Sequence, residues 1–108
     1  MANEFDFTKN RHTWIVAEIG VNHEGDSAIA EKMIRQAAKA GADAVKLEGG
    51  KEVAGIIKSI TESEIPVMGH LGLLPQTAEK YTVQGKTKEN AIQLIEDAKI
   101  ITESGVFS

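Results

Sequence analysis

The chain contains no cysteine, only two prolines and few aromatic residues among its 108 positions. The lack of cysteine excludes a disulfide framework and thiolate zinc sites, and it fits a reducing compartment. One Trp, one Tyr and an excess of acidic over basic residues provide neither the stacking surfaces nor the positive stripe that nucleic acid binding requires. We therefore expect no nucleic-acid partner.

Long apolar runs are also missing. The first residues, MANEFDFTKNRHT, are polar where a signal peptide needs an apolar stretch, and no later run reaches membrane-spanning length. We expect a cytoplasmic protein with no membrane partner. With 42% hydrophobic and 26% charged residues, the composition is typical of one small globular domain.

From Trp14 onward, a short apolar run, a turn and an amphipathic stretch of helical period recur three times. Residues 1–12 lack such periodicity and are expected to form an irregular leader, in which His12 has no assigned role. The expected strands are WIVAEI, DAVKL and IPVMGH. The expected helices are residues 27–40 after an Asp26 N-cap, a second marked by Val53, Ile56, Ile57 and Ile60, and a third that Thr87 caps.

The apolar positions also predict which helix faces are buried. The first helix should bury Ile29, Met33, Ile34 and Ala37, and Gly41 should follow its end. The third should bury Ala91, Leu94, Ile95, Ala98 and Ile101. Gly105 should end that helix, and Val106-Phe107 should begin a fourth strand.

Strands that alternate with helices predict an α/β fold with a parallel sheet, since parallel neighbours need a crossover connection. The fold class is a partial (β/α)8 TIM-type barrel, in which residues 13–108 form one domain of three βα units plus the start of a fourth strand. A complete barrel takes about 250 residues. Either an open sheet with exposed edges or a barrel assembled from several chains is possible, and we expect a homo-oligomer.

In such folds the active site lies at the carboxyl ends of the strands. Glu18, Lys46, Glu48 and His70 occupy these ends, and Lys46 and Glu48 should share one face of a strand. A lysine beside carboxylates suits a keto-acid substrate and a divalent metal. The alternative is an ordinary ion pair between Lys46 and Glu48, which the pattern favours equally.

Other polar residues have both a functional and a structural interpretation. Gly49 and Gly50 either let the backbone approach a ligand or make the turn into the next helix. His70 either donates a hydrogen bond to a substrate or is a core histidine, and the pattern favours the core role. His23 is either a ligand or, more commonly, a residue that caps a turn. Phosphate-loop, dinucleotide-binding and nucleophile-elbow motifs are absent from the sequence.

The stretch AGADAVKLEGG, followed by IPVMGHLGLLPQ, VQGKT and a helix ending in ESG, closely resembles the ketopantoate hydroxymethyltransferase family over about residues 36–108. The resemblance implies a (β/α) barrel that transfers a hydroxymethyl group from methylenetetrahydrofolate to 3-methyl-2-oxobutanoate, with Mg²⁺, in pantothenate biosynthesis. It implies that Lys46 binds the keto acid, that Glu48 is a magnesium ligand, and that His70 is the histidine at the end of the next strand, a candidate catalytic residue.

The run from WIVAEIGVNHEG to AGADAVKL, about residues 13–47, instead resembles the sialic acid synthase family, which condenses phosphoenolpyruvate with an N-acetylated sugar. That resemblance implies that Glu18 lies near the sugar site, as a second candidate catalytic residue, and that Lys46 binds phosphoenolpyruvate. We expect the change between the two resemblances near residues 41–48.

The two resemblances together imply incomplete sites. The two aspartates that hold magnesium in the transferase lie on strands that this chain replaces, and its catalytic glutamate lies beyond Ser108, as do the metal-binding histidines of the synthase. Glu18 could act as a substitute metal ligand. We therefore expect little or no turnover by the chain alone, and we retain two alternatives: a synthase-like condensation, and a non-catalytic α/β scaffold, natural or a designed chimera.

Overall fold

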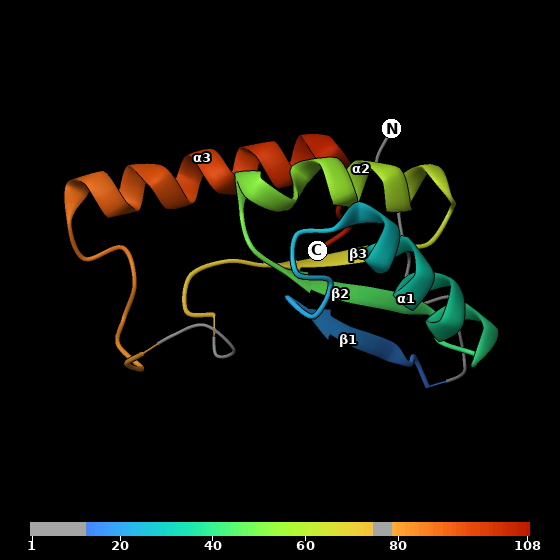
Figure 1. Ribbon diagram of the computed structural model, residues 1–108. Helices are drawn as coiled ribbons and strands as arrows, with labels where there is room; N and C mark the ends of the chain where they lie inside the picture. The colour runs from blue at the N-terminus through green and yellow to red at the C-terminus, as the bar shows by residue number, and fades with distance from the viewer. Residues whose placement is uncertain (1–12, 75–78) are drawn as a thin grey trace.

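The computed structural model describes residues 13–74 and 79–108, which form three consecutive βα units (Figure 1). The expected leader, residues 1–12 with His12, lies outside the described residues. The elements are β1 (Val16–Gly20), α1 (Ser27–Lys39), β2 (Ala44–Glu48), the 3-10 helix η1 (Lys51–Val53), α2 (Ala54–Glu62), β3 (Val67–His70) and α3 (Lys88–Ser104).

The three strands form one parallel sheet in the order β1-β2-β3. After α3 the chain returns beside β3, where the Phe107 N–H donates to the Val67 carbonyl at 2.9 Å and the Gly69 N–H donates to the Ser108 carbonyl at 2.7 Å. Residues 106–108 therefore lie beside β3, where the fourth strand was predicted to begin, although they are not assigned as a strand. The architecture is that of part of a (β/α) barrel, and within the described residues the sheet is open.

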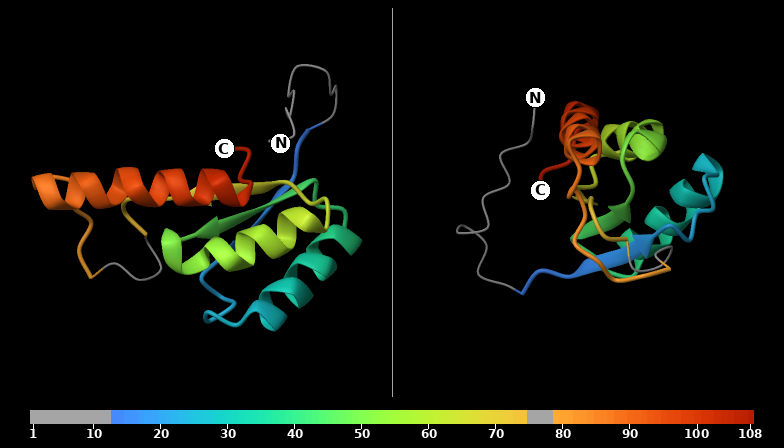
Figure 2. Two further views of the ribbon diagram at one scale, coloured as in Figure 1. Left: turned by 90° about the horizontal axis from the view of Figure 1, so that it is seen from above. Right: turned by 90° about the vertical axis from the view of Figure 1, so that its left-hand side faces the viewer.

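All three helices lie on one side of the sheet (Figure 2). The core fills the space between them and the sheet, with Val45, Leu47 and Val67 from the strands and Ile34, Ile57 and Ile101 from the helices. Because side chains alternate along a strand, Lys46 and Glu48 project from the opposite face. Across residues 13–74 and 79–108, every helix is too short or too polar to cross a bilayer.

The helix ends follow the predicted capping residues. The Asp26 carboxylate accepts the N–H groups of Ala28 and Ile29 at 2.8 and 3.2 Å, and the Thr87 hydroxyl accepts that of Asn90 at 3.1 Å. These contacts satisfy amides that have no partner within the helix. Gly105 ends α3 at φ 111°, a left-handed conformation that favours glycine.

The residues predicted to be buried in α1 and α3 were partly wrong. In α1 the side chain of Ile29 is 40% exposed, and Ala30 is buried in its place. In α3 only Ile101 of the predicted positions is buried, whereas Ile95 is 56% exposed and Ala98 is exposed. Figure 1 shows that the first half of α3 extends past α2 and the sheet, so this half does not pack on the sheet.

The Gly49-Gly50 turn connects β2 to η1 and packs closely against α3. Gly49 has φ 125°, and a Cβ at Gly50 would lie 2.4 Å from Cγ of Asp97. The Asp97 carboxylate accepts the Lys51 N–H at 3.2 Å, and Glu52 accepts the Gly50 N–H at 2.9 Å. Both glycines therefore serve the turn and the approach of α3, which fixes the backbone directly after Glu48.

We predict that Gly50→Ala lowers the free energy of unfolding by about 1–3 kcal/mol, because the added methyl must displace Asp97. Gly55→Ala is the matched control: a Cβ there meets nothing within 4 Å, and alanine favours a helix by about 0.5–1 kcal/mol. Urea unfolding of both variants measures the difference. Equal stability of the two variants would contradict the close packing at Gly50.

Candidate active site

The carboxyl ends of the strands bring four of the predicted residues together in two cross-strand pairs. Register places Glu18 of β1 opposite Lys46 of β2, and Glu48 of β2 opposite His70 of β3. The Lys46 ammonium donates to Oε2 of Glu18 at 2.7 Å. The Glu18 side chain is 49% exposed and that of Lys46 is 26% exposed, so solvent reaches this ion pair.

The second pair is more deeply buried and only loosely joined. Nδ1 of His70 lies 3.7 Å from Oε1 of Glu48, beyond hydrogen-bond distance, and the Glu48 side chain is only 5% exposed. Oε2 of Glu48 and Nδ1 of His70 are buried without a hydrogen-bond partner. Burial of a carboxylate oxygen without a hydrogen-bond partner lowers the stability of the fold. Buried polar atoms of this kind are typical of sites that bind a ligand.

The alternative of an ion pair between Lys46 and Glu48 is wrong, since Lys46 pairs with Glu18 instead. Residues two apart on a strand are separated by about 7 Å, whereas cross-strand neighbours are about 5 Å apart. The cross-strand partner is therefore the closer one. His70 is half-buried, so it is neither a fully enclosed core residue nor a surface residue.

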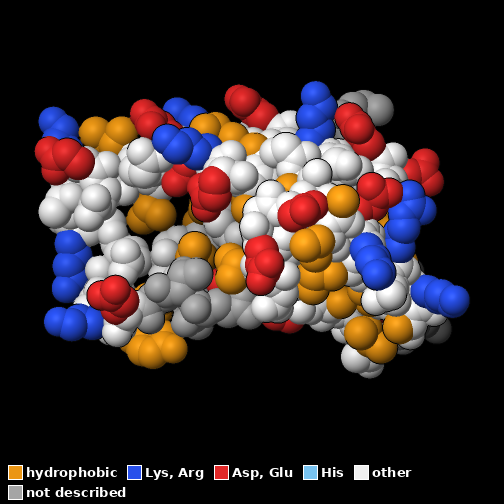
Figure 3. Space-filling view, in the orientation of Figure 1, with side chains coloured by type: hydrophobic (Ala, Val, Ile, Leu, Met, Phe, Trp, Pro, Cys, Tyr) orange, Lys and Arg blue, Asp and Glu red, His pale blue; other side chains and the backbone are white. Residues whose placement is uncertain are grey.

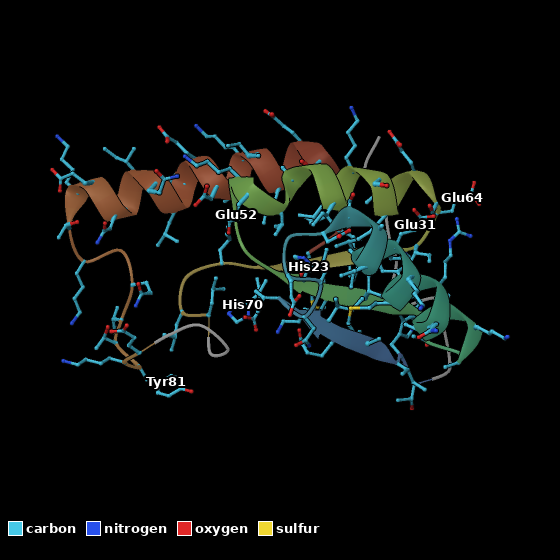
Figure 4. The ribbon with its side chains drawn as sticks, in the orientation of Figure 1. His23, Glu31, Glu52, Glu64, His70 and Tyr81 are labelled. Carbon is cyan, nitrogen blue, oxygen red and sulfur yellow. The ribbon has the colours of Figure 1, made fainter. Side chains whose placement is uncertain are left out.

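His23 caps the turn between β1 and α1, at the same end of the sheet as His70 (Figure 4). Its side chain is buried, and Nδ1 accepts the Gly25 N–H at 3.0 Å. An Nδ1 that accepts a hydrogen bond places the ring proton on Nε2. Burial lowers the pKa of His23 below its ordinary value, and the nearby backbone of Gly20 acts in the opposite direction. The turn-capping interpretation is confirmed.

Two acidic residues next to the site were not predicted. Glu52 and Asp97 accept the N–H groups of Gly50 and Lys51, the two amides that follow Gly49. Glu52 lies in the first turn of η1, where acidic side chains are favourable, and this was a usable signal. Asp97 lies 46 residues after Lys51, and no local pattern in the sequence indicates the contact between them.

The carboxylates of this site provide only some of the ligands that a metal ion needs. Among residues 13–74 and 79–108, no three His, Asp or Glu side chains converge to form a metal site by themselves. Glu48 nevertheless offers one buried oxygen without a partner. Mg²⁺ is commonly held by one or two carboxylates together with substrate oxygens and water, so the donor set fits a substrate-assisted magnesium site.

Charges of both signs are interspersed over the face of the molecule in Figure 3. The Glu18–Lys46 and Glu48–His70 pairs lie on the face of the sheet that the helices do not cover.

We predict that the stability of the protein falls as the pH is lowered below about 6.5, the pKa of an unperturbed histidine. Burial lowers the pKa of folded His23, so the unfolded chain binds more protons between the two pKa values. His23→Asn, which keeps an acceptor for the Gly25 N–H but does not titrate, should lose less stability between pH 7.5 and 5.5. Urea unfolding at both pH values tests this. Equal losses in the two proteins would exclude His23 as the source.

Several known proteins are similar to this chain. The 3-methyl-2-oxobutanoate hydroxymethyltransferase of Nitrosopumilus maritimus is 60% identical over 73 residues, which cover 65% of this chain and 26% of that protein. The enzyme of the same name from Cenarchaeum symbiosum is 58% identical over 73 residues, 65% of this chain and 28% of that protein. The enzyme from Ignicoccus hospitalis is 54% identical over 84 residues, which cover 72% of this chain and 32% of that protein. The chain thus spans about 30% of the length of these relatives.

The family model for ketopantoate hydroxymethyltransferase matches residues 9–108. The match includes residues 13–47, and the resemblance of that segment to sialic acid synthase receives no support from these comparisons. The predicted change of resemblance near residues 41–48 stays a prediction. On the extent of the match and the identity to its relatives, the chain belongs to the ketopantoate hydroxymethyltransferase family.

Proposed function

We propose that the chain provides the keto-acid site for hydroxymethyl transfer from methylenetetrahydrofolate to 3-methyl-2-oxobutanoate, the reaction of pantothenate biosynthesis that gives ketopantoate. The observation that carries the proposal is a partly exposed Lys46 next to a buried, incompletely bonded Glu48 on one face of the sheet. The family and the name of the relatives support the same substrate. We propose little or no turnover by the chain alone, because its described residues supply only part of a metal site.

Lys46 would bind the carboxylate of the keto acid. Its ammonium is a compact charge with three donors, of which Glu18 takes one. The side chain is about three-quarters buried, and electrostatic attraction is stronger there than in bulk water. A small carboxylate can therefore be held at Lys46 and oriented across the sheet toward Glu48.

Glu48 would hold Mg²⁺ through its second oxygen, which has no partner in the structure. When bound, the ion would supply Lewis-acid stabilisation of the negative charge that develops on the keto oxygen. The oxygen is buried, so a ligand that reaches it must displace a neighbouring side chain. The loose 3.7 Å contact between Glu48 and His70 is compatible with such a movement.

His70 would donate a hydrogen bond to the substrate from the end of β3. Glu48 lies opposite His70, with its Oε1 3.7 Å from Nδ1 of the imidazole. A hydrogen bond from the imidazole would stabilise negative charge that develops on a substrate oxygen. This is the catalytic role that we assign to His70.

The alternative condensation of phosphoenolpyruvate is less compatible with the geometry. The amides of Gly50 and Lys51, beside the end of β2, are occupied by the carboxylates of Glu52 and Asp97. These carboxylates would repel a phosphate group and leave Lys46 as the place for a small anion. A non-catalytic scaffold is the remaining alternative.

We also propose a homo-oligomer, which would cover the edge of β1 in the described sheet. A cytoplasmic location is proposed from the cysteine-free composition.

Isothermal titration with 3-methyl-2-oxobutanoate tests the keto-acid site. We predict that Lys46→Met weakens binding about 10- to 100-fold, which is the range for loss of a hydrogen bond to a charged group. Lys58→Met, which removes an exposed lysine from α2, should bind like the wild type. Added Mg²⁺ should tighten binding to the wild type but not to Glu48→Gln.

Three results would contradict the proposal. Equal binding by Lys46→Met and the wild type would exclude Lys46 as the anion site. Binding of phosphoenolpyruvate in place of the keto acid would favour the synthase alternative. Absence of binding to either compound, with or without Mg²⁺, would favour a non-catalytic scaffold.

A further inference from the structure

We propose that Glu18 is a resident counter-ion of Lys46, with which the carboxylate of a bound substrate competes for the ammonium. Glu18 thereby limits the affinity of this site for anions. The inference rests on the proposed role of Lys46 in keto-acid binding, and it assigns Glu18 a role in limiting affinity in place of a catalytic or metal-binding role.

The contact between the two residues follows from the sheet register. Glu18 lies directly opposite Lys46, and its Oε2 accepts from the ammonium at 2.7 Å. The next pair along the sheet, Glu48 and His70, is separate and comes from β2 and β3. Glu18 is thus directed to the lysine, and the buried free oxygen of Glu48 belongs to the other pair.

The exposure of the two side chains indicates which one moves. Glu18 is 49% exposed and Lys46 is 26% exposed, so the carboxylate can turn into water while the ammonium stays at the sheet. A pair that solvent reaches is weak, which makes the exchange possible. Substrate binding then replaces one carboxylate by another, and only the difference between the two contacts contributes to affinity.

The same geometry produces repulsion when exchange is incomplete. An incoming carboxylate that binds Lys46 while Glu18 remains in place brings two negative charges to one ammonium. Like charges at this distance oppose binding, and the opposition ends when Glu18 loses its charge or leaves. Removal of the Glu18 charge should therefore strengthen anion binding, which a residue with a purely structural role would not do.

The test is isothermal titration of 3-methyl-2-oxobutanoate in EDTA, without metal, into the complete chain. We predict that Glu18→Gln binds the keto acid about two- to fivefold more tightly than the wild type, the range that weak exposed ion pairs allow. Glu24→Gln is the matched control, since it removes the same charge from an exposed position in the turn after β1. Its affinity should match that of the wild type.

A second variant covers the case in which Glu18→Gln does not fold, which circular dichroism would report. Glu18→Asp keeps the charge but withdraws it by one methylene, so its affinity should lie between those of the wild type and Glu18→Gln. Equal or weaker binding by a folded Glu18 variant, while Lys46→Met still loses binding, would overturn the counter-ion role alone. Equal affinity of Lys46→Met and the wild type for the keto acid would overturn the keto-acid site as well. An equal gain in Glu24→Gln would show a general charge effect and overturn the role of Glu18.

Discussion

The parallel register of β1, β2 and β3 is the constraint on which the candidate site depends. It sets Glu18 opposite Lys46 and Glu48 opposite His70, so four polar residues from three strands meet at one end of the sheet. The helices cover the other face, where Val45 and Leu47 are buried. A shift of β2 by one residue would turn Lys46 and Glu48 into that apolar layer, and burial of unpaired charges would oppose it strongly.

The loops beside the sheet are held by polar contacts that the protein makes with itself. His23 accepts the Gly25 N–H in the first loop, and Glu52 and Asp97 accept the amides that follow Gly49 in the second. These contacts satisfy backbone groups and fix the chain next to Glu18 and Glu48. They leave Lys46 as the cation at the sheet face and Glu48 as the carboxylate with a free buried oxygen.

Much of the fold could be predicted from the sequence because local signals agree with the tertiary structure. Asp26 and Thr87 mark the helix starts, and Val53, Ile56, Ile57 and Ile60 are all buried as their spacing predicts. The exposed face of α3 could not be predicted, since helical period does not report that a helix extends past the sheet. For the site, the strand ends identified the four residues, but their pairing depends on register, which a single strand sequence does not specify.

The chain belongs to a family whose relatives are named for a keto-acid substrate, and its own geometry suggests how such a substrate would be held. Lys46 is the central residue of the proposed keto-acid site. A crystal structure with 3-methyl-2-oxobutanoate and Mg²⁺ tests the role of Lys46 directly. We expect the substrate carboxylate at the Lys46 ammonium, with Glu18 turned into solvent. A bound substrate elsewhere, with Lys46 still joined to Glu18, would contradict it.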